Sequence, residues 1–279
     1  MLTRRRFLAR GAGAVAGAAL ALYATRIEPR WVQVVRRRMP VPGLPAALAG
    51  RTLVQLSDLH VGPRVDERYV VSVLELARGL APDLVAFTGD FVTYHDPRQL
   101  EQLSRVLRHA PRGRLATLGI LGNHDYGPGW SDAGVAAEAE RRAREAGIAI
   151  MRNEVMDVRG LTVVGFDDLW AHRFDPAPVL ARLPRDRAAL YLCHNPDCVD
   201  RMGWTDERGW TLAGHTHGGQ VKLPLLPPPL LPVSNRRYAA GAVDLGRDRW
   251  LYVNRGIGHL IPVRIGVRPE VTVFSFEQA

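Results

Sequence analysis

Cysteine is nearly absent from this chain of 279 residues, which contains only Cys193 and Cys198. Two cysteines exclude the disulfide framework of a small secreted domain and the four-ligand spacing of a zinc ribbon. A single bridge between them would require an oxidising compartment. We expect instead two buried thiols beside the end of a strand, because free cysteine behaves as a small hydrophobic residue.

Long hydrophobic runs are absent as well. Residues 11–24 are uncharged and rich in glycine and alanine, but they are fewer than the roughly 20 apolar residues of a transmembrane helix. Their length is typical of the apolar region of a signal peptide, and Ala19-Leu20-Ala21 offers a small-residue cleavage site.

The preceding segment, Thr3-Arg4-Arg5-Arg6-Phe7-Leu8, resembles a twin-arginine export signal. We therefore expect residues 1–24 to be an export signal or anchor, and the protein to lie in the periplasm, the cell envelope or at the membrane of a bacterium. An ordinary basic start to an uncleaved anchor is the alternative. Because arginines flank both sides of the apolar stretch, the sequence leaves open whether the segment is removed.

The rest of the chain has little excess charge. Nine arginines and one glutamate in residues 1–38 account for +8 of the formal net charge of +9. A protein that binds nucleic acid needs its basic surface on the folded domain. We therefore exclude nucleic acid as a partner.

No interdomain linker and no repeat of solenoid period is visible in the sequence. We expect a basic lead-in over residues 25–50 and one domain over residues 51–279. In its first half, predicted strands alternate with predicted helices, which favours an α/β fold with a largely parallel sheet. These strands are expected at 52–56, 84–87 and 115–118, and the helices at 66–80, 98–109 and 133–146.

The second half is dominated by short predicted strands with small connections, which indicate a second β-rich layer. These are expected at 155–158, 161–165, 190–192, 210–212, 239–245, 250–254 and 271–276. Both halves together predict a four-layer α/β/β/α sandwich with two mixed central sheets.

Five short stretches combine His, Asp and Asn, mostly beside glycine, and each follows a predicted buried strand. Loops at the carboxyl ends of parallel strands meet in space, and these residue types commonly hold metal ions. The glycines permit close backbone approach. Seven candidate ligands result: Asp58, His60, Asp90, Asn123, His194, His215 and His217.

Seven ligands are too many for one ion but suit two ions that share a bridging carboxylate. Asp58 and His60 are expected to point the same way, as alternate residues of a strand do. Taken singly, each of the seven has a simpler interpretation as a strand-end polar residue satisfied by loop backbone. Five such stretches in one chain favour a shared site.

In order and spacing these motifs resemble the calcineurin-like metallophosphoesterase family, over roughly residues 50–276. The longer strings 57–62, 194–197, 214–220 and 254–258 resemble its exported or membrane-associated bacterial branch. The resemblance implies hydrolysis of a phosphate ester or pyrophosphate, in which a hydroxide between two metal ions attacks phosphorus in line.

The resemblance also implies the role of each ligand. Asp58, His60 and His217 would hold the first ion, and Asn123, His194 and His215 the second. Asp90 would bridge the two ions.

Three further residues receive roles. The family pattern implies that His124 stabilises the transition state or protonates the leaving oxygen, and that Asp125 orients its ring. Arg255 lies in a glycine-rich turn and is a candidate contact for the substrate phosphate, with a structural turn as the alternative.

The identity of the metal ions is inferred from one difference between this chain and a related group of enzymes. Iron-containing purple acid phosphatases place a tyrosine three residues after the bridging aspartate, whereas this chain has Thr93 there. We therefore expect two divalent ions rather than a ferric–tyrosinate centre. Manganese is the first choice, with zinc, iron or magnesium as alternatives.

The remaining candidates have ordinary interpretations. His95, His109 and His172 are expected at the surface or at helix ends, and His259 in a turn. The uncharged, proline-rich residues 223–233 cannot form a helix or a central strand. We expect a loop packed over the sheet edge, with an apolar lip for an acyl chain or a bilayer as the alternative.

The resemblance implies a phosphate ester or pyrophosphate as substrate. Because similar proteins include hydrolases of UDP-2,3-diacylglucosamine, it also implies a lipid-linked or cell-envelope compound as a candidate, with the membrane surface as a further partner. Two alternatives stay open. One is a non-catalytic binding scaffold of the same fold, which should have lost ligands or His124. The other is a metal-dependent hydrolase of non-phosphate esters. The sequence does not reveal the preference among mono-, di- and pyrophosphates or the oligomeric state.

Overall fold

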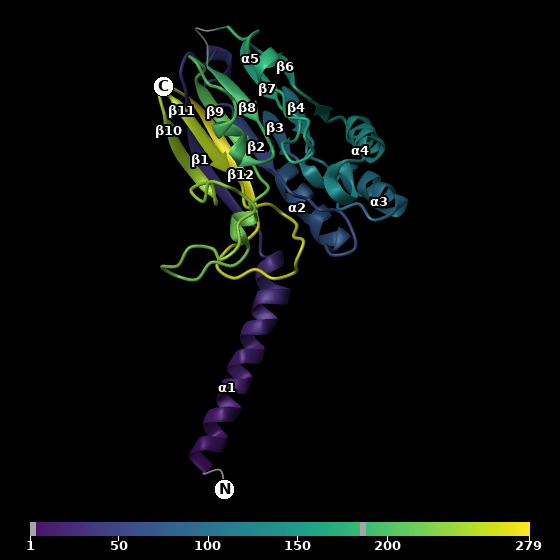
Figure 1. The fold of residues 1–279 in the computed structure, drawn as a ribbon, viewed down its shortest axis with the longest axis vertical. Helices are drawn as coiled ribbons and strands as arrows, with labels where there is room; N and C mark the ends of the chain where they lie inside the picture. The colour runs from purple at the N-terminus through teal and green to yellow at the C-terminus, as the bar shows by residue number, and fades with distance from the viewer. Residues whose placement is uncertain (1–3, 185–187) are drawn as a thin grey trace.

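A computed structural model of the protein describes residues 4–184 and 188–279. Residues 1–3, with which the expected export signal begins, and residues 185–187 lie outside the described part. The body of the protein consists of two six-stranded sheets packed face to face, with helices on the outer side of the first (Figure 1).

The two sheets are both mixed, as predicted. The first has the order β1 (Gln33–Val41), β12 (Glu270–Gln278), β2 (Thr52–Leu56), β3 (Leu84–Thr88), β4 (Ala116–Ile120) and β5 (Ala149–Ile150). The second has the order β10 (Gly241–Gly246), β11 (Arg249–Val253), β9 (Gly209–Ala213), β8 (Ala189–Leu192), β7 (Leu161–Gly165) and β6 (Glu154–Val158). Strands β2 to β5 are parallel in the first sheet, and β7, β8, β9 and β11 are parallel in the second.

Three helices cover the outer face of the first sheet: α2 (Glu67–Gly79), α3 (Pro97–Leu107) and α4 (Ala133–Glu145). Each begins after an aspartate whose carboxylate accepts a hydrogen bond from a backbone N–H of the first turn. The outer layer of the second sheet is thinner. Only α5 (Ala177–Leu180), the short helical turn Pro196–Asp200 and loops contribute to it in the described chain.

The space between the sheets is filled by aliphatic and aromatic side chains. Leu53 and Ile120 of the first sheet and Val163 and Leu212 of the second are buried there in one cluster. Burial on both faces explains why the strands appear in the sequence as continuous apolar runs rather than alternating patterns. This packing aligns the two sheets and so determines which strand ends meet.

Residues 25–50 are more than the expected lead-in, because they contribute the edge strand β1. This strand pairs in parallel with β12 over nine residues. Its Met39 and Val41 are buried in the cluster between the sheets. The exposed run Arg36-Arg37-Arg38 conceals this strand in the sequence.

Strand β12, expected within the second β-rich layer, instead returns to the first sheet. It lies antiparallel to β2, with Phe274 opposite Leu53. The two-residue strand β5 was also not predicted, because so short a run has no measurable periodicity.

The N-terminal helix α1 (Arg4–Leu22) projects away from the body of the protein (Figure 1). From residue 11 to residue 22 every side chain is exposed. Short helical turns over Tyr23–Ile27 and Glu28–Arg30 connect it to β1. Among the described residues, no helix has both the length and the apolar content needed to span a membrane.

A chain that starts at Arg51 is expected to be less stable than one that starts at Ala21. Loss of β1 exposes the side of β12 and removes the buried Met39 and Val41, which should lower the free energy of unfolding by about 3–6 kcal/mol. Urea unfolding followed by tryptophan fluorescence measures this. The chain from Ala21 should unfold at the same urea concentration as the full chain. Equal unfolding midpoints for all three chains would show that β1 contributes nothing to stability.

Candidate metal centre

Five loops that follow β2, β3, β4, β8 and β9 carry all the predicted metal ligands. In the first sheet β2, β3 and β4 are adjacent and parallel, and in the second sheet β8 and β9 are. Their carboxyl ends therefore lie at one edge of the sandwich, where the two sheets face each other.

Strand alternation was expected to bring Asp58 and His60 to the same side. Instead, the ligand side chains converge because of an unusual backbone conformation. Strand β2 ends at Leu56, so Asp58 and His60 lie beyond it. Asp58, His60, Asp90, His215 and His217 all have positive φ angles, of 54°, 47°, 55°, 70° and 49°. Such a conformation costs a non-glycine residue on the order of 1–3 kcal/mol, and its recurrence at five ligand positions marks a functional site.

Two glycines permit the loops to touch. A Cβ atom on Gly122 would overlap the Asp90 carboxylate, and one on Gly214 would overlap Ser57 and the Asp58 carboxylate. This confirms the close approach expected of the glycines beside the ligands.

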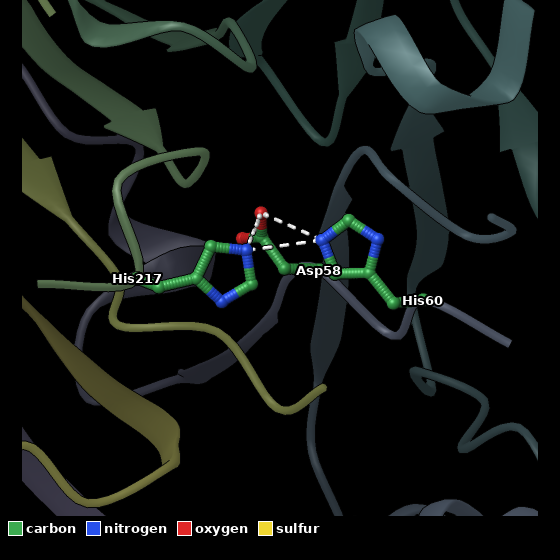
Figure 2. Close-up of side chains that lie close together, drawn as sticks. All are labelled: Asp58, His60 and His217. Carbon is green, nitrogen blue, oxygen red and sulfur yellow. Dashed lines mark hydrogen bonds and ion pairs between the residues drawn. The ribbon is translucent and has the colours of Figure 1, made fainter. Parts of the chain in front are cut away.

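The first ligand group consists of Asp58, His60 and His217 (Figure 2). The distance between His60 Nε2 and His217 Nε2 is 3.0 Å, and Asp58 Oδ1 lies 3.3 Å from His217 Nε2 and 3.9 Å from His60 Nε2. All three side chains are buried. Three ligand atoms thus face one small space.

The second ligand group consists of Asp90, His194 and His215. His215 Nδ1 lies 3.3 Å from His194 Nε2. Asp90 Oδ2 lies 3.1 Å from His194 Nε2 and 3.6 Å from His60 Nε2, which belongs to the first group. One carboxylate oxygen therefore lies between the two groups, in the position that a bridging ligand requires.

Asn123 provides an independent test of whether the residues fit a metal. Its side chain is fully buried, and neither its carbonyl oxygen nor its amide nitrogen has a hydrogen-bond partner in the described structure. A buried amide without partners costs free energy, so a ligand for the oxygen is expected at this point. The donor set of imidazoles, carboxylates and one amide suits divalent transition metals.

Hydrogen bonds to the outer ring nitrogens determine which histidine atoms carry lone pairs. His194 Nδ1 lies 2.7 Å from Thr88 O, and His215 Nε2 lies 3.0 Å from Pro232 O. Because a carbonyl can only accept, these nitrogens carry protons, so His194 Nε2 and His215 Nδ1 are the atoms that would face a cation. His60 Nδ1 contacts Thr93 Oγ1 at 2.9 Å, and this hydroxyl can serve either tautomer of the ring. Thr93 therefore positions His60.

Burial controls the charge of the site. It lowers the pKa of His60 and of His215 to about 3, so both rings are neutral at ordinary pH. Burial also raises the pKa of the Asp58 carboxyl to about 7. Burial opposes the charge of His194, but the Asp90 carboxylate outweighs it and raises the His194 pKa, so without a cation these two side chains form a buried ion pair. A bound cation would take the place of the His194 proton and compensate the Asp90 carboxylate.

His124 lies at the centre but is not a member of either group. Its backbone N–H donates to Asp90 Oδ1 (2.9 Å), and its half-exposed ring lies edge to face with the His60 ring. No hydrogen bond within the described residues engages the ring. It lines a cavity of about 340 Å³ that opens onto both ligand groups.

Asp125 does not orient the His124 ring, contrary to the expectation. Its Oδ2 accepts the backbone N–H of Gly122 (2.9 Å), and its Oδ1 accepts that of Val92 (3.0 Å). The carboxylate therefore joins the loop after β4 to the loop after β3. Its role is to position the loops that carry Asp90 and His124.

Arg255 does not face the substrate cavity either. Its guanidinium pairs with the buried carboxylate of Glu270 and donates to Gln33 Oε1 (3.1 Å). It is not part of the cavity lining formed by the described residues. The structural interpretation of this turn is therefore the better one.

Sequence reasoning missed Arg264, which is fully buried beside the first group. Its guanidinium donates to the carbonyls of Arg255 (3.0 Å) and Gly258 (2.8 Å) and lies 3.4 Å from His217 Nδ1. Burial lowers its pKa to about 10, so it stays protonated. A single arginine between short apolar residues gave no sign of this position.

Two tryptophans on the cavity wall were also missed. Trp130 and Trp170 stack with ring centroids 4.7 Å apart, and Trp170 lies edge to face with His215 at 4.3 Å. Trp130 lies in the loop after β4, beyond Asn123 and His124, and Trp170 lies in the loop after β7, which carries no predicted ligand. The cavity lining also includes the aliphatic side chains of Leu230, Ile261 and Val263.

The proline-rich residues 223–233 border this cavity, and Pro228 also lies near Gly241 of the edge strand β10. Pro229, Leu230 and Pro232 belong to its lining. Among the other histidines, His95 and His172 are exposed and His109 pairs with Glu75, as expected of surface residues.

Two further expectations concern buried side chains. Cys193 and Cys198 are buried and free, as expected. His259 is buried in the turn where it was predicted to lie.

Replacement of Asp125 by alanine is expected to act on stability first. It leaves the buried N–H groups of Gly122 and Val92 without acceptors, which should lower the free energy of unfolding by about 2–6 kcal/mol. Asp157 is a matched control, because its carboxylate accepts the N–H of Gly160 in an exposed turn. Urea unfolding of both variants checks this, and equal small losses would contradict the role given to Asp125.

Comparison with known proteins identifies the family. The calcineurin-like phosphoesterase family matches residues 51–219. The chain is 34% identical to phosphodiesterase YaeI of Escherichia coli, over 99% of both chains, and 31% identical to the uncharacterized metallophosphoesterase YkuE of Bacillus subtilis, over 99% of this chain and 98% of that one. It is 27% identical to the UDP-2,3-diacylglucosamine pyrophosphatase LpxG of Chlamydia trachomatis, over 90% of this chain and 91% of that one. The protein therefore belongs to the calcineurin-like phosphoesterase family and is a hydrolase of phosphoester bonds.

Proposed function

We propose that this protein hydrolyses a phosphate ester or pyrophosphate at two divalent ions held by the ligand groups described above. The observation that carries the proposal is the Asp90 oxygen, which lies between the two groups at 3.1 and 3.6 Å from their histidines. The buried, unpartnered Asn123 supports it. Asp58, His60 and His217 would hold one ion, and Asn123, His194 and His215 the other.

Divalent ions supply Lewis-acid stabilisation of the charge on phosphoryl oxygens and make water acidic enough to act as a nucleophile at neutral pH. The chain's own residues supply the geometry. Hydrogen bonds of the ring nitrogens to Thr88 O, Thr93 Oγ1 and Pro232 O fix the histidine rings. Asp125 joins the loops after β3 and β4, and this contact holds Asp90 and His124 in position on the cavity wall.

His124 is the residue proposed to act on the substrate directly. Its ring is half exposed on the cavity wall, and no described residue hydrogen-bonds to it. The ring can therefore donate a proton to the leaving oxygen or stabilise charge on the phosphoryl group. For a metal, manganese is proposed, because Thr93 supports His60 where a tyrosine ligand would be needed for a ferric centre.

A lipid-linked substrate such as UDP-2,3-diacylglucosamine is the finer proposal. Two observations support it. The relative LpxG is named as a pyrophosphatase of this compound. The cavity combines the ligand groups with a wall of two tryptophans and several aliphatic side chains, which suits a substrate with an apolar part beside its phosphate.

Export by a twin-arginine route is a further proposal and rests on the resemblance of residues 3–8 to such a signal. Because this route carries folded proteins, it would allow the buried ligand groups to acquire their ions before export.

Metal-dependent turnover is the test of the proposed reaction. The full chain should hydrolyse bis-p-nitrophenyl phosphate or p-nitrophenyl phosphate with Mn²⁺, lose activity after chelation and regain it when Mn²⁺ returns. His124→Ala should lower kcat on the order of 10²–10⁴-fold while two ions stay bound. Asp90→Asn should abolish turnover and reduce the metal content measured by plasma mass spectrometry.

His109→Ala is the matched control, because this histidine pairs with Glu75 away from the cavity and should leave activity and metal content unchanged. Release of UMP from UDP-2,3-diacylglucosamine in the same assay tests the finer proposal. If ions are bound but none of these substrates is hydrolysed, both the proposed reaction and the lipid-linked substrate are contradicted. A chain that binds no ion and turns over no substrate would be a scaffold.

The export proposal predicts that conservative replacement of both Arg4 and Arg5 by lysine retains the protein in the cytoplasm. Charge is kept, so only recognition of the arginine pair is lost. Fractionation of cells that express the full chain measures this. Arg36→Lys with Arg37→Lys is the control, and equal distribution of both variants would argue for an ordinary anchor.

A further inference from the structure

Exposed large hydrophobic side chains are concentrated at one end of the molecule. Twelve occur in the described chain, and ten belong to residues 15–31, residues 223–230 and Ile261, which together we call the apolar end. The other two, Leu76 and Val155, lie on α2 and β6. Single exposed apolar residues are ordinary, but a concentration of this kind marks an interaction surface.

Hydrogen bonds join the three segments into one surface. Gln220 Nε2 donates to Ile261 O (2.7 Å), and the N–H of Ile265 donates to Gln220 O (2.9 Å), so the loop after β9 lies along the loop after β11. The N–H of Arg264 donates to Ala24 O (2.9 Å), just after α1. Figure 1 shows both loops gathered at the base of α1.

Several apolar side chains of the apolar end are highly exposed to solvent. Leu225 is completely exposed and Leu230 is 75% exposed, in a loop where prolines exclude helix and central strand. Trp31, 51% exposed, lies under the guanidinium of Arg268 at 3.9 Å. Aromatic and leucine side chains beside arginine are the composition of surfaces that enter the headgroup region of a bilayer.

Exposed charge around these side chains is mostly positive. Five basic residues of the same segments and nearby positions are exposed: Arg26, Arg30, Lys222, Arg236 and Arg237. Arg30 pairs with the exposed Asp66 (3.8 Å), whereas no ion pair joins the other four to a described residue. Glu28, in the first segment, is buried and accepts the N–H of Val267 (2.7 Å). The surface is therefore complementary to anionic headgroups. A symmetric contact with a second copy would instead place like charges together.

We propose that the apolar end is a docking surface for the anionic surface of a lipid bilayer. The leucines enter the boundary between headgroups and acyl chains, and the arginines and Lys222 contact lipid phosphates. The inference concerns side chains outside the two ligand groups and is independent of which phosphate ester is hydrolysed.

Docking in this way would place the mouth of the cavity at the bilayer. Leu230, Leu260 and Ile261 belong both to the apolar end or its neighbours and to the lining of the cavity that contains His124. A substrate anchored in the membrane by acyl chains would then reach the ligand groups without complete transfer into water.

Co-sedimentation of the full chain with vesicles of phosphatidylglycerol and phosphatidylethanolamine tests the proposal. We expect binding that weakens with added salt and with replacement of phosphatidylglycerol by phosphatidylcholine. Leu225→Asp with Leu226→Asp should weaken binding at least tenfold. Neither side chain lines the cavity, so metal-dependent hydrolysis of a soluble ester should be unchanged.

Val155→Asp is the matched control, since it places the same charge at an exposed apolar position on the distant strand β6 and should leave vesicle binding unchanged. Leu225→Ser with Leu226→Ser is a second pair that removes the apolar contact without adding charge. Unchanged binding of both leucine pairs, or no binding by the parent chain, would overturn the proposal. So would a concentration-dependent dimer, seen by analytical ultracentrifugation, that the leucine variants abolish while vesicle binding persists.

Discussion

The Asp58 carboxylate joins the two halves of this molecule, and the candidate metal centre depends on that contact. Asp58 lies after β2 of the first sheet and accepts the backbone N–H of His215, after β9 of the second, at 3.0 Å. Gln55 adds a second link by donating to Ala213 O (2.9 Å). The contact is possible because Gly214 has no side chain. Through it, candidate ligands from two separate sheets come within 3.0–3.9 Å of one another.

The centre concentrates features that destabilise a folded chain. Five non-glycine residues have left-handed backbone, carboxylates are buried, and the Asn123 amide has no partner in the described structure. The apolar core between the sheets and the hydrogen bonds of Asp125 and Arg264 hold these groups in place. Strain of this kind persists where the surroundings over-determine the conformation, and bound cations would relieve its electrostatic part.

The cavity lining combines two kinds of residue. The ligand groups and His124 are polar, whereas Trp130, Trp170 and residues of the loops after β9 and β11 add aromatic and aliphatic surface. These loops also carry the exposed leucines at the base of α1. The loops after β4 and β9 each carry residues of both kinds, since His124 and Trp130 share the first and His215 and Leu230 share the second.

The sequence by itself determined the local properties: the apolar runs that become buried strands, the capped helices, and the short polar stretches at the strand ends. It therefore predicted the two sheets and the seven residues that the structure gathers at one edge. Only the tertiary structure decided the rest, because that depends on contacts between distant segments. The pairing of β1 with β12, the bonds of Asp125 to Gly122 and Val92, the ion pair that turns Arg255 away from the cavity, and the burial of Arg264 all join residues that no local pattern connects.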